Sequence, residues 1–361
     1  MNVLILNQFV PPDASPTARL AGDLAALCHA RGHRAVLAGA GQSYQTGARG
    51  WRRLAGEAAA WAALDRAACA AERPDCIIAL SSPPCLLAAA ARAARRHRAR
   101  LVHWAMDLYP ETAVALGVLP RAAAPPFAFL MRRAYQSCAR VIALDADMAE
   151  RLGRAGAPPP AIVPPWPPDW EEPSAFLRPA GAPPEARLWM YSGNLGRAHE
   201  AAVLIEAQQR LEARGTAWWL VVQGGGAGWE AARAAARGLR QCLFLPHASE
   251  AEAPARLAAA EVLAVTRRPA ARGLLWPSKL AAALAWPRRI AWIGDTDSAA
   301  AAQVRHHPGS MAFASGDAPA LADWLCALPP APLPPLPSGA LRRARAEGME
   351  RWWSAALAEQ G

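Results

Sequence analysis

Residues 191–200, Tyr-Ser-Gly-Asn-Leu-Gly-Arg-Ala-His-Glu, carry residue types suited to binding a phosphorylated ligand. Gly193 and Gly196 flank Asn194 directly after an apolar run that predicts a strand. Glycine lets the backbone approach a ligand closely, and Arg197 can offer a two-pronged guanidinium to a diphosphate. We interpret this segment as a diphosphate-binding loop. The alternative is a glycine turn beside a solvated arginine.

A second candidate lies at Ser278 and Lys279. Lys279 is the only lysine among the 39 lysine and arginine residues of the chain. Ser278 is predicted to cap the helix that follows, which places Lys279 in the first helical turn. A cation there opposes the helix dipole unless an anion is bound. The pair is therefore predicted to bind phosphate, with a plain surface lysine as the alternative.

The loop containing Pro12, Asp13 and Ser15 follows the first apolar run. Ser15 is predicted as the N-cap of a helix that begins at Pro16 and continues to Arg31. Ligands of open α/β sheets bind at the carboxyl ends of strands, so this loop is a third candidate for ligand contact. The alternative is an ordinary strand-to-helix connection.

Two Asp-x-Asp pairs are candidates for holding a metal ion that bridges a diphosphate: Asp145 with Asp147, and Asp295 with Asp297. Both follow a predicted strand and open a helical stretch, where aspartate commonly caps. We interpret both pairs as structural and predict no metal. The glycine clusters do not fit G-x-G-x-x-G, and no Walker A sequence occurs, so no nucleotide cofactor is predicted.

The elements that position these residues follow an alternating pattern of short apolar runs and alanine-rich helical stretches, which predicts an α/β fold with parallel sheets. The predicted strands are 3–9, 34–38, 75–80, 100–105, 140–144 and 161–164, then 188–192, 218–223, 242–245, 262–266, 290–293 and 311–314. The predicted domains are 1–165 and 187–328, joined by a proline-rich linker at 166–186, with a helix in 339–361 that packs back on the first domain.

Length, composition and charge indicate where the protein is located and which partners it binds. The 361 residues are long enough for two domains, and no apolar run is long enough to span a bilayer. The N-terminus lacks the features of a signal peptide, so we expect a cytoplasmic protein. A net charge of +10 attracts polyanions. Nucleic acid is not predicted, because the sequence has no compact basic face with aromatic platforms.

Arg132 and Arg133 beside Phe127 and Phe129 suit an anionic membrane surface. A peripheral position on the inner face of the cell membrane is therefore one interpretation. The alternative is an amphipathic helix with one core face and one solvated face.

The sequence resembles the family-4 glycosyltransferases of bacterial exopolysaccharide and lipopolysaccharide assembly. The resemblance rests, in order along the chain, on segments 7–13, 104–111, 191–196, 277–280 and 293–295. It implies the GT-B fold, in which two Rossmann-like domains enclose an interdomain cleft. It also implies retaining, metal-independent transfer from a nucleotide-diphosphate sugar bound by the C-terminal domain to a saccharide or lipid-linked acceptor on the N-terminal domain.

Carried over by residue, the resemblance implies the following site. Gly193, Asn194, Gly196 and Arg197 line the diphosphate with Ser278, Lys279 neutralises the leaving phosphate, Asp107 lies near the reacting sugar, and Pro12, Asp13 and Ser15 form an acceptor-side loop. Two glutamates typical of many members align with Leu274 and Ala282. This departure supports an alternative function, a catalytically silent GT-B protein that binds nucleotide or partners an active transferase.

Overall fold

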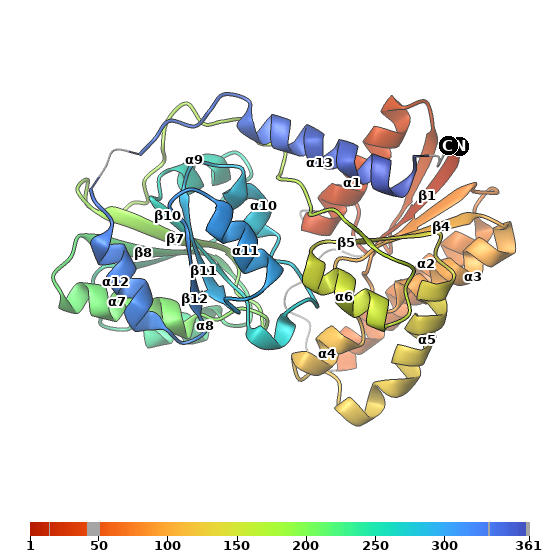
Figure 1. Cartoon of the computed structure of the whole chain (residues 1–361), viewed down its shortest axis with the longest axis horizontal. Coiled ribbons are helices and arrows are strands. Elements are labelled where there is room, and N and C mark those ends of the chain that lie inside the picture. The colour runs from red at the N-terminus through yellow and green to blue at the C-terminus, as the bar shows by residue number, and fades with distance from the viewer. Residues whose placement is uncertain (14, 42–50, 331–332, 359–361) are drawn as a thin grey trace. The chain divides into compact units, whose positions relative to one another are not determined.

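A computed structural model describes residues 1–13, 15–41, 51–330 and 333–358. The chain divides into two compact units (Figure 1). The first unit contains Met1–Pro165, Gly273–Trp276 and Glu347–Gly361, and the second contains Trp166–Arg272 and Pro277–Ala346. Each unit is an α/β structure built on its own parallel sheet.

The first sheet has six strands in the order β2-β1-β3-β4-β5-β6. Their bounds are β1 Asn2–Leu6, β2 Arg34–Ala38, β3 Cys76–Ala79, β4 Arg100–Trp104, β5 Arg140–Ala143 and β6 Ala161–Ile162. All neighbouring pairs are parallel. The central strands are buried on both faces, which is why they appear in the sequence as short continuous apolar runs.

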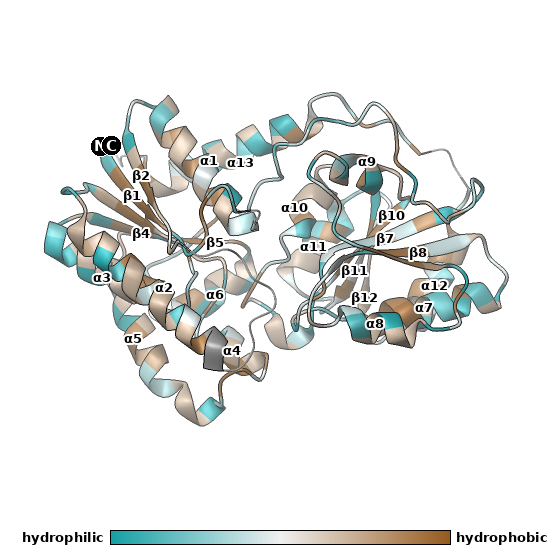
Figure 2. Ribbon diagram, turned by 180° about the vertical axis from the view of Figure 1, so that it is seen from behind, coloured by the Kyte–Doolittle hydropathy of each residue, from teal (hydrophilic) through white to brown (hydrophobic). Residues whose placement is uncertain are grey.

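Helices cover both faces of the first sheet. Their bounds are α1 Pro16–Ala30, α2 Trp51–Ala70, α3 Leu86–His97, α4 Glu111–Ala115, the 3-10 turn η1 Arg121–Ala123, α5 Pro125–Gln136 and α6 Ala146–Arg154. Helices α2, α3 and α5 lie on one face, and α1 lies on the other (Figures 1 and 2). The predicted cap of α1 is confirmed, since Ser15 accepts a hydrogen bond from the backbone N–H of Ala18.

The last helix, α13 Ala340–Ala356, contributes residues to both units. Its second half belongs to the first unit, where the fully buried Trp352 packs 5.3 Å from Trp104, measured between ring centroids. Arg31 lies 4.6 Å over the ring of Trp353 and forms an ion pair with Glu350. An apolar stripe flanked by charged contacts thus fixes this end of the chain to the first unit.

The second sheet also has six parallel strands, in the order β12-β11-β10-β7-β8-β9. Their bounds are β7 Arg187–Asn194, β8 Trp218–Gly225, β9 Cys242–Leu245, β10 Val262–Thr266, β11 Arg289–Gly294 and β12 Met311–Ala314. The helices are α7 Ala202–Ala213, α8 Trp229–Ala235, α9 Ala253–Ala258, η2 Pro269–Ala271, α10 Lys279–Leu284, α11 Ala299–His306 and α12 Ala318–Ala327. Residues from β7, β8, α7 and α12 share one buried apolar cluster.

All twelve predicted strands occur, and the fold class is confirmed. One local prediction is wrong: Gly193 and Asn194 are not in a loop but inside β7, which continues two residues beyond the predicted end. The reason is that β8 also continues through glycines, so that Gly193 pairs with Gly224 and Asn194 with Gly225. The two strand ends therefore form a paired backbone surface.

Candidate functional site

The carboxyl ends of β7 and β8 approach each other so closely that side chains are excluded. Gly224 has a φ of +138°, and a Cβ atom there would lie 2.2 Å from the carbonyl oxygen of Gly193. A Cβ at Gly226 would lie 2.6 Å from Oδ1 of Asn194. Only glycine satisfies both the dihedral angle and the spacing. The strand ends thus present bare backbone at the sheet edge where ligands of α/β proteins bind.

Lys279 lies against this glycine surface. A Cβ atom at Gly193 would be 3.1 Å from Cε of Lys279. The ammonium group donates a hydrogen bond of 2.6 Å to the hydroxyl of Tyr191 and lies 4.1 Å from the centre of its ring. The Tyr191 hydroxyl in turn donates to the carbonyl oxygen of Asn194 at 2.9 Å. This chain of contacts holds Lys279 beside Gly193 and Asn194.

Lys279 carries its charge in a half-buried position. Among the described residues, no carboxylate lies within ion-pair distance of its ammonium group. Loss of solvation lowers the pKa of Lys279 from 10.5 to about 7. A desolvated cation without a counter-ion is unfavourable by itself, and an anionic ligand would relieve that cost.

The prediction that Ser278 caps α10 is wrong. Ser278 occupies the N-cap position, but its side chain makes no capping hydrogen bond, and its φ and ψ of −56° and −29° are helical. An N-cap side chain needs extended backbone to turn back toward the helix N–H groups. Lys279 does begin the helix, as predicted, but its side chain is directed to Tyr191.

Two residues of this site, Tyr191 and His199, were not identified from the sequence. Nδ1 of His199 lies 2.6 Å from the carbonyl oxygen of Thr266, at the end of β10. The His199 ring makes an edge contact with Tyr191 at a centroid distance of 6.0 Å. Burial and the charge of Lys279 lower the pKa of His199 to about 3. Both residues lie within the segment 191–200 that the glycines had indicated, which was the available signal.

Arg197 and Gly196 follow β7 in the same segment. The Arg197 side chain is exposed, and the N–H of His199 donates to the carbonyl oxygen of Gly196 at 3.1 Å. Arg268, at the end of β10, donates from Nε to the carbonyl oxygen of His199 at 3.3 Å. The structure therefore brings Gly193, Asn194 and Lys279 into contact and places two arginines on the adjoining loops.

The two Asp-x-Asp pairs differ in their roles. Asp145 caps α6, accepting from the N–H of Met148 at 2.8 Å, as predicted. The second pair is not a cap, and Ser298 caps α11 instead.

Asp295 forms a buried ion pair with Arg267 at 2.7 Å, and Asp297 forms an exposed ion pair with Arg272 at 2.7 Å. Both carboxylates are thus engaged by neighbouring arginines, and Ser298 is left to cap the helix.

In the first unit, the loop after β1 is held by its own side chains. Asp13 accepts from the N–H of Ser15 at 2.8 Å, and Ser15 caps α1. At the carboxyl edge of the first sheet, Pro12 is exposed, Asp13 is half-buried and Ser15 is buried. The candidate acceptor-side residues therefore lie where a ligand of an α/β sheet would be expected.

Asp107 follows β4 at the same edge of the first sheet. It forms an isolated β-bridge with Leu275, and the N–H of Leu108 donates to the carbonyl oxygen of Leu274 at 2.9 Å. Burial raises the pKa of the Asp107 carboxyl from 3.8 to about 6. Asp107 also lines a narrow pocket with Ser81, His103 and other side chains of the first unit. Leu274 is buried in this unit, and Ala282 is buried within α10 of the second.

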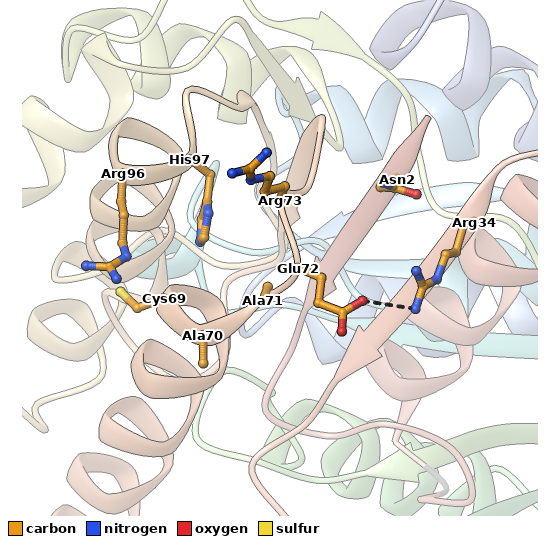
Figure 3. Close-up of a pocket in the computed structure, with 9 residues that line it drawn as sticks. All are labelled: Asn2, Arg34, Cys69, Ala70, Ala71, Glu72, Arg73, Arg96 and His97. Carbon is orange, nitrogen blue, oxygen red and sulfur yellow. Dashed lines mark ion pairs between the residues drawn. The ribbon is translucent and has the colours of Figure 1, made fainter.

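A separate groove of the first unit lies at the amino ends of β1 and β2 (Figure 3). It has a volume of about 810 Å³, and Arg73, Arg96 and an exposed Arg34–Glu72 ion pair of 3.5 Å lie around it. Because the Pro12 loop follows the opposite end of β1, this groove is separate from the candidate site.

Two Rossmann-like units in one chain, with the candidate site residues at the carboxyl edges of the two sheets, are the GT-B class of fold. Residues 17–166 match the family model described as the glycosyl transferase 4-like domain. The first unit therefore contains a domain of the glycosyl transferase 4-like type. No curated protein matches the sequence at a significant level.

Several solved structures share this fold over nearly the whole chain. HepE from Anabaena, solved in complex with UDP-glucose, is 14% identical, with a TM-score of 0.63 and coverage of 97% of this chain and 95% of its own. Sucrose-phosphate synthase from Thermosynechococcus elongatus is 14% identical, with a TM-score of 0.64 and coverage of 98% and 94%. WaaG, a glycosyltransferase involved in lipopolysaccharide biosynthesis, is 15% identical, with a TM-score of 0.60 and coverage of 100% and 96%.

Proposed function

We propose that the protein transfers a sugar, with retention of configuration and without a metal, from a nucleotide diphosphate to a saccharide or lipid-linked acceptor in cell-surface polysaccharide synthesis. The observation that carries this proposal is the uncompensated, desolvated cation Lys279 on the bare backbone of β7. That arrangement suits a diphosphate better than any neutral ligand. The UDP-glucose complex of HepE supports a nucleotide sugar as the donor.

The chemistry follows from where charge develops. Breaking the bond between the anomeric carbon and the diphosphate leaves the electron pair on the leaving phosphate, and fixed cations there stabilise the transition state. Lys279 and Arg197 supply the positive charge, while Gly193, Asn194, Gly196 and Ser278 allow close approach. Asp107 and the Pro12–Ser15 loop serve the acceptor. The proposal needs no metal, because Asp145 is engaged as a cap and Asp295 and Asp297 are engaged by arginines.

A catalytically silent, nucleotide-binding protein is the second candidate function. It is favoured by the apolar character of Leu274 and Ala282, which supply no carboxylate to a donor. The two functions differ in one measurement. An active transferase releases nucleoside diphosphate continuously in the presence of donor and acceptor, whereas a silent protein binds the nucleotide and releases none by turnover.

The proposed donor class is tested by titrating the protein with UDP, GDP, ADP and their sugars in excess EDTA, with calorimetry and thermal unfolding as readouts. One nucleotide is expected to bind selectively and to raise the free energy of unfolding by about 2.7 kcal/mol at a concentration 100 times its Kd. Binding of none of them would contradict the proposed function. Binding only after Mg²⁺ or Mn²⁺ is added would contradict metal independence.

We further propose that the protein works at the cytoplasmic, anionic surface of a membrane, contacted through α5. Phe127, Phe129 and Leu130 are exposed large apolar side chains on this helix, and Phe129 is the most exposed at 65%. Arg132 and Arg133 are exposed on the same helix, and residues 112–144 contain no aspartate or glutamate. Figure 2 shows apolar and polar residues mixed along α5. Among the described residues, no helix has the length and apolarity needed to cross a bilayer.

The double substitution Arg132→Glu/Arg133→Glu is expected to weaken binding to vesicles containing phosphatidylserine by at least about 30-fold. Each basic residue near an anionic surface contributes about 1 kcal/mol. Vesicle sedimentation measures the effect, and nucleotide affinity should not change. Arg233→Glu/Arg237→Glu on the second unit makes the same change in charge and serves as the control. Equal losses in both variants would show that only net charge matters and would remove α5 from the proposal.

A further inference from the structure

His199 is held in one orientation at the edge of the candidate donor site. Its Nδ1 lies 2.6 Å from the carbonyl oxygen of Thr266, and the N–H of Glu200 donates to the Thr266 hydroxyl at 3.2 Å. The ring also contacts Tyr191, the partner of Lys279. The end of β10 and the edge of Tyr191 therefore fix the position of the imidazole.

The contact with Thr266 also fixes the tautomer. A carbonyl oxygen only accepts hydrogen bonds, so Nδ1 must carry the proton and donate it. Nε2 of the neutral ring is then an acceptor. This atom has no hydrogen-bond partner among the described residues, and it is not one of their buried polar atoms, so it is open to solvent.

The surroundings of His199 offer few carboxylate acceptors. Residues 262–294, which include β10, α10 and β11, contain no aspartate or glutamate. Arg197, Arg268 and Lys279 can only donate. Asp295 is engaged with Arg267 in a buried ion pair. Besides hydroxyl groups and the amide oxygen of Asn194, this part of the edge offers the Glu200 carboxylate and Nε2 of His199 as side-chain acceptors.

A sugar attached to a diphosphate needs such acceptors, because each hydroxyl group has a proton to donate. We propose that Nε2 of His199 accepts a hydrogen bond from a hydroxyl group of the donor sugar. This inference rests on the proposed function, since the sugar is bonded to the phosphate that Lys279 would neutralise. It assigns His199 to recognition of the sugar, and Lys279 and the glycine surface to recognition of the diphosphate.

The neutral state of His199 suits this role. A protonated imidazole would donate from both nitrogens and would repel Lys279. The low pKa of His199, caused by burial and by the charge of Lys279, keeps the lone pair of Nε2 present at physiological pH.

The test compares His199→Phe with the parent protein in calorimetric titrations of the free nucleoside diphosphate and of its sugar conjugate. Phe keeps an aromatic ring but has no acceptor. His199→Phe should weaken binding of the nucleotide sugar by roughly 3-fold to 10-fold and leave the affinity for the free nucleotide within about 2-fold, as expected for one neutral hydrogen bond. His199→Gln, which restores an acceptor, should recover part of the loss.

The outcomes separate this inference from the proposed function. Equal weakening of nucleotide and nucleotide sugar in His199→Phe would show that His199 only supports the loop and would overturn the inference. Unchanged affinity for both ligands would overturn it as well. If the parent protein binds no nucleotide, the proposed function fails first, and the inference fails with it. Thermal unfolding of both variants shows whether either substitution disturbs the fold.

Discussion

Lys279→Ala is expected to lower turnover by roughly 10-fold to 200-fold. A hydrogen bond between charged groups contributes about 1.5–3 kcal/mol, and about 1.4 kcal/mol corresponds to a factor of ten in rate. The substitution lowers turnover because the bond between Lys279 and the leaving phosphate strengthens as negative charge develops there in the transition state. Steady-state nucleotide release measures it. Arg237→Ala, which removes an exposed cation at the end of α8, is the control and should turn over normally.

Lys279 should support turnover but lower the free energy of unfolding. The pKa of Lys279 is about 7 in the folded protein and 10.5 in its ordinary state, because burial disfavours the charge. Between these values the unfolded chain binds more protons, so the contribution of Lys279 to the free energy of unfolding rises with pH from 7 to 10.5. Below pH 7 the buried charge is fully destabilising. Lys279→Met, which fills a similar volume without charge, should therefore unfold at a higher temperature than the parent at pH 7.

Donor binding should also depend on pH through Lys279. At pH below 7 the lysine is already protonated in the unliganded protein, and affinity for the nucleotide sugar should be constant. At pH above 7 binding must draw a proton from solution, so affinity should fall by up to about tenfold per pH unit until the pKa of the complex is reached. Lys279→Met should lose this dependence.

Lys279→Arg should restore part of the activity, since the charge returns on a broader, planar group beside Gly193. Normal turnover of Lys279→Ala with every donor that the parent accepts would show that the diphosphate does not rest against α10. The roles of Asn194 and Arg197 would then lose their main support.

The sequence predicted the two sheets well because their strands are buried on both faces. Such strands appear as isolated apolar runs between alanine-rich helices, and residues 242–245, 262–266 and 311–314 were located to the residue. Strand ends were less predictable. Glycine is unfavourable in a strand by itself, and only the pairing of Gly193 with Gly224 makes it necessary there.

The site was predicted in part. Glycine spacing and the unique lysine located Gly193, Asn194 and Lys279 because each has a local signature. Tyr191 lies in the segment that the glycines indicated, but nothing marked it as the partner of Lys279, which is 88 residues away, because it looks like any aromatic residue of a buried strand. The same limit applied to Asp295, whose pairing with Arg267 depends on the neighbouring positions of β10 and β11.

Gly224→Ala is expected to destabilise the second unit by more than about 3 kcal/mol. The added Cβ would lie 2.2 Å from the carbonyl oxygen and 2.8 Å from the carbonyl carbon of Gly193. Both atoms belong to the backbone of a paired central strand, so neither can move without breaking the ladder between β7 and β8. The φ of +138° adds strain for any residue with a Cβ.

Thermal and denaturant unfolding measure the loss, and nucleotide titration should show weaker binding because Gly193 and Asn194 shift with the strand. Gly153→Ala is the matched control. Gly153 lies within α6, where an added Cβ meets no atom within 4 Å, so alanine should raise stability by up to about 1 kcal/mol. If Gly224→Ala lowers stability while Gly153→Ala raises it, the loss at Gly224 is due to the contact with Gly193. A Gly224→Ala variant as stable as the parent would contradict the close approach of β7 and β8, and with it the bare backbone surface proposed to receive the diphosphate.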